Sequence, residues 1–136
     1  MTTRTPRGIR NNNPGNIERT TVRWKGMAAV QSDPRFITFV SPPWGIRAMA
    51  RILLGDWREG QDTIASIIQE WAPPHENDTG AYVRAVAKAC GVEPYQPCNI
   101  PALLPRMISA MIRHENGVQP YSPEVIRLGI DLEWSA

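Results

Sequence analysis

Prolines and glycines divide the chain after residue 40 into short segments, and this division limits the possible folds more than any other feature of the sequence. Pro42-Pro43 and Pro73-Pro74 stand at the edges of such segments, because proline suits the first turn of a helix but breaks its interior. Gly60, Gly91 and Gly117 follow other segments, where glycine suits the left-handed turn that ends a helix. Each segment is therefore a candidate helix with defined ends.

Apolar residues recur at helical spacing within these segments, which predicts five helices. They run from Ser41 to Gly60, from about Thr63 to Trp71, from Thr79 to Gly91, from Asn99 to Gly117, and, as a short last helix, from Ser122 onward. Thr79 and Asn99 are expected to cap their helices. In the first helix, the stripe that faces the core is expected to run from Ile46 to Trp57.

The chain before residue 40 lacks this spacing. Its run "RFITFV", Arg35 to Val40, is rich in β-branched and aromatic residues between turn residues, which predicts one short strand. Its expected hairpin partner is the segment around Val22 to Trp24. We therefore expect a single, mostly α domain over residues 1–136 with a small β-hairpin element, and a flexible arm at residues 1–6. The arginines near this end are expected to be solvated: Arg4, Arg7 and Arg10.

Composition excludes several classes of function. A net charge of +2, from 15 basic and 13 acidic residues, is too balanced for nucleic-acid binding as the main activity. Cys90 and Cys98 form no C-x-x-C motif, so neither a zinc site nor a disulfide framework is expected, and only a single bridge between them stays open. No apolar run approaches about 18 residues, and the amino end lacks the hydrophobic centre of a signal peptide. We expect synthesis in the cytoplasm, no membrane insertion, and no metal or cofactor.

Glu115 is the strongest candidate for catalytic chemistry. His75 and His114 have no accompanying nucleophile motif such as G-x-S-x-G, and are expected to be surface or packing residues. Glu115 continues the inward-facing apolar stripe of its helix into the last turn. Partial withdrawal from water and the negative end of the helix dipole both favour the neutral, proton-donating form of a carboxyl group there. The alternative is a helix-end glutamate rotated just clear of the core.

Several stretches resemble, in a changed order, the motifs of lysozyme-like lytic transglycosylases. The stretches "RNNNPGNI", "RWKG" and "RFITFVSPPWGIRAMARIL" resemble the segment that follows the catalytic glutamate in this superfamily. The stretch "ISAMIRHENGVQPYS" resembles the helix that ends in that glutamate, yet here it comes last. Together with "WAPPHENDTGAYV", these stretches resemble small phage proteins that look like circularly permuted lytic transglycosylases. The resemblance implies a lysozyme-like fold whose chain ends lie close together.

The resemblance also implies a peptidoglycan-binding cleft with Glu115 as its catalytic residue. Amide side chains both donate and accept hydrogen bonds, which suits N-acetylated sugars and makes the asparagine-rich turn a candidate wall opposite Glu115. Asparagine also occupies left-handed turns for purely local reasons, so each asparagine has a structural alternative. The expected substrate-binding residues are Asn12, Asn13, Asn16, Trp24, Glu76, Tyr82 and Tyr121.

Three of these residues have further alternatives. Glu76 is the second candidate for the catalytic acid, and it also stands where a carboxylate stabilises the start of a helix. Tyr82 resembles the tyrosine that flanks the transglycosylase cleft, and it equally suits a core position with its hydroxyl at the rim. Trp24 is the tryptophan best suited to stacking on a sugar ring, whereas Trp44 and Trp71 are expected in the core.

The implied reaction is cleavage of the β-1,4 bond between N-acetylmuramic acid and N-acetylglucosamine, with a 1,6-anhydro product. Attack by water instead would make the enzyme a muramidase. A glycan-binding module without chemistry and a structural phage virion protein are the alternatives from other classes. The expected partners are peptidoglycan glycan strands and other phage virion proteins. The expected place of action is the periplasmic cell wall, reached either in a phage particle or by release at lysis.

Overall fold

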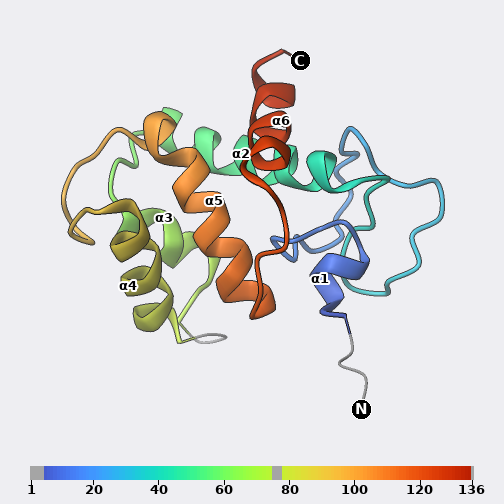
Figure 1. Ribbon diagram of the computed structural model, residues 1–136, viewed down its shortest axis with the longest axis horizontal. Coiled ribbons are helices and arrows are strands. Elements are labelled where there is room, and N and C mark those ends of the chain that lie inside the picture. Colours follow the sequence, from blue (N-terminus) through green and yellow to red (C-terminus); the bar gives the residue numbers. More distant parts are fainter. Residues whose placement is uncertain (1–4, 75–77, 136) are drawn as a thin grey trace.

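The computed structural model describes residues 5–74 and 78–135, and helices dominate these residues (Figure 1). The helices are α1 (Arg7–Arg10), α2 (Pro42–Arg58), α3 (Ile64–Trp71), α4 (Thr79–Cys90), α5 (Ile100–Asn116) and α6 (Pro123–Trp134). The last five confirm the predicted helices and the mostly α fold class. The first is one short turn that apolar spacing does not reveal. None of the described helices is long and apolar enough to cross a membrane.

Polar side chains cap several helices, and Asn99 does so as predicted. The side-chain oxygens of Thr63 and Asn99 each accept a hydrogen bond of 3.2 Å from a backbone N–H in the first turn of α3 and α5. The cap of α4 is Asp78 instead of the predicted Thr79. The Thr79 hydroxyl instead donates to the carbonyl oxygen of Ala72 at 2.5 Å, which ties the start of α4 to the end of α3.

Two helices, α2 and α5, are at the centre of the packing. The first contacts α6, α5 and α3, and the second also packs against α4, α6 and α1 (Figure 1). Apolar side chains from α2 to α6 form the main core. A smaller core of Ile37, Phe39 and Ala48 joins the N-terminal segment to α2. The prediction that Trp57 belongs to the core-facing stripe of α2 is wrong, because its side chain is exposed at the end of the helix.

The prediction of a strand at Arg35 to Val40, paired in a hairpin with Val22 to Trp24, is wrong. Among the described residues this extended segment makes only two isolated antiparallel bridges, and neither uses residues 22–24. The bridges join Glu18 with Phe36 and Met27 with Phe39.

Asparagine side chains explain why no continuous ladder forms. The Asn13 amide donates to the carbonyl oxygen of Ile37 at 2.9 Å, and the Asn12 amide donates to that of Phe39 at 3.0 Å. These carbonyl groups are the acceptors that a partner strand would need. The β-branched and aromatic segment is therefore extended, but the asparagine-rich turn, residues 11–16, takes the place of a neighbouring strand.

Arg7 is bound to the domain and does not belong to a solvated arm, contrary to prediction. Its guanidinium donates to both carboxylate oxygens of Asp33, at 2.6 and 2.7 Å, and lies 4.7 Å from the centre of the Phe36 ring. Asp33 also accepts hydrogen bonds from the backbone N–H groups of Arg35 and Phe36 and from the Asn11 amide. The Asp33 carboxylate thus joins α1, the asparagine-rich turn and the extended segment.

The two ends of the described chain do not lie close together. In Figure 1, α1 and the end of α6 are at opposite edges of the molecule, and α6 packs chiefly against α2, whereas α1 packs against α5. The expectation that the chain ends are neighbours is therefore wrong for the residues that the structure describes.

Asp33→Asn should lower the melting temperature at neutral pH and have less effect in acid. Hydrogen bonds from Arg7 outweigh the cost of desolvation and, with those from the backbone of Phe36 and Arg35, hold the pKa of Asp33 well below its usual range. A carboxyl group with a depressed folded-state pKa stabilises the fold fully above its unfolded pKa of about 3.9. This contribution is lost as the pH falls through the folded-state value. Thermal unfolding from neutral pH down to about pH 2 measures the difference.

Glu18→Gln is the matched control, because it also replaces a carboxylate by an amide in an ion pair with an arginine. In this pair the side chain of Arg35 is 58% exposed and that of Glu18 is 55% exposed. Exposed ion pairs contribute little to stability, so this variant should melt close to the wild type. A melting temperature for Asp33→Asn that matches that of Glu18→Gln at neutral pH would contradict the role assigned to Asp33.

Candidate active site

A cleft of about 610 Å³ lies between the N-terminal segment and the helices. Asn16 lines it from the asparagine-rich turn, Phe36 from the extended segment and Ile52 from α2. Trp71, at the end of α3, and Glu115, in the last turn of α5, complete this part of the lining. The cleft therefore draws on segments from both ends of the chain.

Glu115 is half-buried at this cleft, and neutral donors hold both of its carboxylate oxygens. Oε1 accepts a hydrogen bond from the side-chain amide of Asn16 at 3.2 Å, and Oε2 accepts one from the indole N–H of Trp71 at 3.3 Å. Within the described ranges Glu115 forms no ion pair. Two neutral donors from different segments therefore fix the orientation of the carboxyl group at the cleft, without a cation in contact with it.

The asparagine-rich turn reaches Glu115 because it bends tightly against the end of α5. Asn16 has a φ of 51°, in the left-handed region that asparagine tolerates better than most residues. Asn116, next to Glu115, donates from its amide to the carbonyl oxygen of Pro14 at 2.8 Å. Gly8 is buried where an added Cβ would lie 2.6 Å from the Asn116 side chain and 2.7 Å from that of Asn16. A side chain at position 8 would therefore separate the turn from α5.

Trp71 brings α3 to the same carboxylate. Its ring is half-buried, packs against the main core and also lines the cleft, so the expectation of a core tryptophan is only part of its role. Gly15 of the asparagine-rich turn contacts this ring closely, since an added Cβ would lie 2.9 Å from Cζ2 of Trp71 and 2.8 Å from Cγ of Met49. Trp71 thus fixes the turn, α3 and Glu115 relative to one another.

Tyr82 lies behind Glu115 and does not line the cleft. Its side chain is buried, and its hydroxyl has no hydrogen-bond partner of regular geometry among the described residues. Burial and the nearby charge of Glu115 raise the pKa of Tyr82 well above its usual range. Its ring stacks on that of His114, with ring centres 4.0 Å apart. Tyr82 therefore packs behind Glu115 and does not reach the cleft, where it was predicted to contact substrate.

The other carboxylates near the cleft are less suited to act as an acid. Glu18 lines the cleft, but its carboxylate is already paired with the guanidinium of Arg35 at 2.6 Å. Glu70 lines the cleft in an exposed position. Partial burial, followed by the charges of Glu70 and a neighbouring glutamate, raises the pKa of Asp56 to about 6, but Asp56 does not line the cleft. Glu115 is therefore the half-buried, unpaired carboxylate of the cleft.

Of the three asparagines predicted to bind substrate, only Asn16 lines the cleft. Asn13 is fully buried, and its amide donates to the backbone oxygens of Ile17 and Ile37, so its role is structural. Asn12 adopts a left-handed conformation, with a φ of 52°, and its amide is bound to Phe39. Asn13 therefore cannot contact a substrate, contrary to prediction, and Asn12 does not line this cleft.

The remaining predicted residues do not gather at the cleft. Trp24 packs against the second core, and Tyr121 packs against the main core, where burial raises its pKa. Neither lines the cleft, so neither ring is placed to stack on a sugar bound there. Glu76 lies outside the described residues.

Two site residues escaped the sequence patterns. Trp71 was expected only in the core, although its place immediately before Ala72-Pro73-Pro74 marks the point where α3 stops and the chain turns along the cleft. Gly8 stands just before the asparagines, and no local pattern signals that its missing side chain makes room for Asn116. Contacts between residues about one hundred positions apart are not visible in local spacing.

No protein-family model matches the chain. Protein P5 of Pseudoalteromonas phage PM2 is 42% identical over 132 residues, which cover 94% of this chain and 81% of the phage protein. The chain belongs to the family of this phage protein. This relationship links the chain to bacteriophages.

Gly8→Ala should destabilise the fold by about 1–3 kcal/mol, because an added methyl group overpacks a closed contact. The methyl group would meet the backbone oxygen of Asn13 at 2.9 Å as well as the side chains of Asn16 and Asn116. Thermal unfolding gives the change in stability, and the NMR signal of the Asn16 side-chain amide reports whether its bond to Glu115 is lost.

Gly55→Ala is the matched control. Nothing lies within 4 Å of an added Cβ at this position of α2, and alanine stabilises a helix relative to glycine by about 0.5–1 kcal/mol. We expect opposite signs for the two variants. A Gly8→Ala protein as stable as the wild type, with an unchanged Asn16 signal, would show that the turn does not depend on this close approach.

Proposed function

We propose that this protein is a lytic transglycosylase that cleaves the glycan strands of peptidoglycan, with Glu115 as its single acid and base. The observation that carries the proposal is the setting of Glu115, which is half-buried at a cleft, held by Asn16 and Trp71, and in no ion pair among the described residues. A residue that exchanges a proton with bound substrate must be held where the substrate can reach it. The bonds from Asn16 and Trp71 hold the Glu115 carboxyl group in that position at the cleft.

The resemblance to transglycosylases adds independent support. The two stretches that carry it, the asparagine-rich turn and the E-N-G at the end of α5, are joined by a hydrogen bond although Asn16 and Glu115 are 99 residues apart. A shared cleft is the arrangement that the resemblance requires. The proposed fold is accordingly lysozyme-like with its motifs in a changed order, although the separated ends of the described chain count against a simple circular permutation.

The proposed reaction uses one proton twice. Neutral Glu115 donates its proton to the glycosidic oxygen, the bond from this oxygen to C1 of N-acetylmuramic acid breaks, and N-acetylglucosamine leaves with a free hydroxyl group. The acetamido oxygen of the substrate stabilises the electron-poor C1. Ionised Glu115 then takes the proton of the C6 hydroxyl as its oxygen bonds to C1. The product is a 1,6-anhydro sugar, and Glu115 is neutral again.

Part of the cleft wall suits a sugar chain. Trp71 and Ile52 offer apolar surface, while Asn16 offers an amide group. Sugars present both apolar ring faces and groups that donate and accept hydrogen bonds, so a mixed wall of this kind fits them. The relationship to the phage protein supports a bacteriophage setting, and within it we propose a role in cell-wall degradation, with other virion proteins as partners.

Glu115→Gln should reduce the clearing of a purified peptidoglycan suspension by about 10²- to 10⁴-fold, because glutamine keeps the shape of the side chain but cannot deliver a proton. The variant should still fold, which thermal unfolding measures, and it should still cosediment with insoluble peptidoglycan. Glu70→Gln is the matched control, since Glu70 lines the same cleft and undergoes the same chemical change. It should clear peptidoglycan close to the wild-type rate.

Other outcomes would redirect the proposal. Clearing by Glu115→Gln at the wild-type rate, with loss in Glu76→Gln, would move the acid to the segment between α3 and α4. A wild-type protein that cosediments with peptidoglycan but never clears it would be a glycan-binding module. A wild-type protein that does neither would fit a structural virion component.

A further inference from the structure

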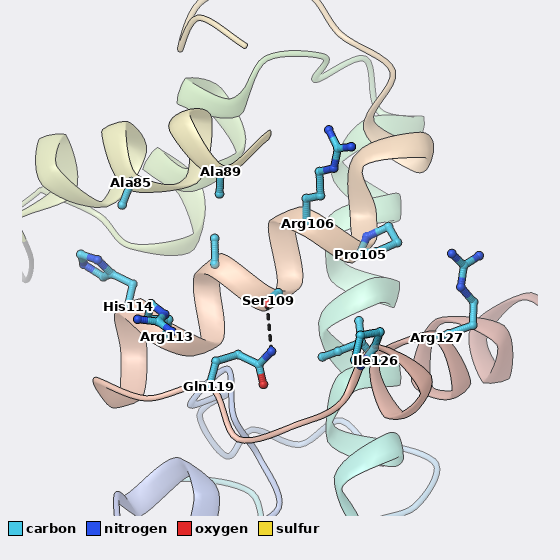
Figure 2. A pocket seen from close by; sticks show the side chains of 12 residues that line it. Ala85, Ala89, Pro105, Arg106, Ser109, Arg113, His114, Gln119, Ile126 and Arg127 are labelled. Atoms are coloured by element: carbon cyan, nitrogen blue, oxygen red, sulfur yellow. Dashed lines mark hydrogen bonds between the residues drawn. The ribbon is translucent and has the colours of Figure 1, made fainter. Parts of the chain in front are cut away.

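A second hollow, of about 730 Å³, opens between α4, α5 and α6, and none of its lining residues lines the cleft. Figure 2 shows Ala85 and Ala89 pointing from α4 toward α5, with Ile126 on the α6 side. Gln119, from the connection between α5 and α6, donates to the hydroxyl of Ser109 at 3.0 Å, as the dashed line in Figure 2 marks. We call this hollow the α4–α6 groove.

The floor of the α4–α6 groove consists mainly of small and apolar side chains. Ala85 and Ala89 are one turn apart on α4, and Ser109 and Ala110 lie on the facing side of α5. Small side chains at such positions let the backbone of another helix approach closely, and an apolar floor is stabilised when apolar side chains cover it.

The rim of the groove is positively charged. Arg106 and Arg113 line it from α5, and Arg127 lines it from α6. All three are exposed, and within the described ranges none forms an ion pair and no carboxylate lines the groove. Arg106 and Arg113 are seven residues apart, which separates them by about 10 Å along α5. The cations are thus spread along the groove rather than gathered at one point.

We propose that the α4–α6 groove binds an acidic amphipathic helix of a partner protein. Apolar side chains of such a helix would cover Ala85, Ala89 and Ala110, while carboxylates along its flanks would pair with the spread arginines. The groove offers three unpaired cations and no anion, so charge complementarity selects an acidic occupant. The same pattern of an apolar stripe with charged flanks is a general mode of helix recognition in grooves.

Other occupants fit the groove less well. A membrane surface is flat and cannot reach the floor of a concave groove. A small anion would meet one arginine but not three that are separated along α5 and across to α6. Nucleic acid would find no Phe, Tyr or Trp side chain in the lining on which a base could stack, and the ring of His114 is already stacked on Tyr82.

The test uses the isotopically labelled full chain and NMR titration with a synthetic peptide of about 16 residues, long enough for about four helical turns. The peptide carries leucines at i, i+3, i+4 and i+7 spacing and glutamates on both flanks, and a second peptide has lysines in place of the glutamates. Saturable shifts at Ala85, Ala89, Ser109 and Ala110 with the acidic peptide alone are expected. Glu115→Gln should bind this peptide as the wild type does, so the result is independent of the proposed function.

The charge argument has its own variants. Arg106→Glu combined with Arg127→Glu should weaken binding of the acidic peptide by about tenfold or more, because attraction becomes repulsion. Arg23→Glu combined with Lys25→Glu is the matched control, since it makes the same change in net charge at exposed positions of an N-terminal loop and should change binding by less than about twofold. Should the first pair impair folding, Ala85→Trp fills the groove from an exposed position of α4 and should also abolish binding.

Several results would overturn the proposal. These are the absence of saturable shifts with the acidic peptide, equal binding of the lysine peptide, and shifts that map to the cleft instead of the groove. Equal weakening by the two charge-reversal pairs would show that only net charge matters. Shifts in the groove with anionic phospholipid vesicles but not with the acidic peptide would assign the surface to a membrane.

Discussion

Two adjacent side chains at the end of α5 hold the N-terminal turn against the helical part of the chain, and the site depends on this junction. The Asn116 amide donates to the carbonyl oxygen of Pro14 at 2.8 Å, and Glu115 accepts from the Asn16 amide at 3.2 Å. Gly8 permits the approach, because any larger side chain would occupy the space of the Asn116 and Asn16 amides. The same few contacts therefore close the fold and orient the carboxylate that we propose as the acid.

The asparagines divide structural and site roles by their position in the turn. Asn11, Asn12 and Asn13 bind Asp33 or the backbone of the extended segment, in place of a partner strand. Only Asn16, after the bend at Pro14-Gly15, points to the cleft. Buried amides need hydrogen-bond partners, and those of Asn11, Asn12 and Asn13 find them in Asp33 and the extended segment. These bonds fix the backbone of the turn, and from this backbone the Asn16 side chain reaches Glu115.

Local patterns in the sequence predict the helices well and the N-terminal segment poorly. The ends of a helix depend on residues next to them in the sequence. The predicted cap at Asn99 and the predicted glycine end at Gly117 are both found at the ends of α5. The inward placement of Glu115 also follows from the spacing of one helix. The strand prediction fails because β propensity says nothing about the asparagine amides that compete for the same carbonyl groups. Likewise, identical residue types at Asn13 and Asn16 give no local sign that one is buried and the other lines the cleft.

The identity of the soluble products tests the central claim most directly. Mass spectrometry of the material released from purified peptidoglycan by the wild-type protein should find muropeptides that end in 1,6-anhydro-N-acetylmuramic acid, and Glu115→Gln should release none. Products with reducing ends would contradict the transglycosylase reaction and assign the attack on C1 to water. The absence of any soluble product from the wild-type protein would contradict a catalytic role for Glu115.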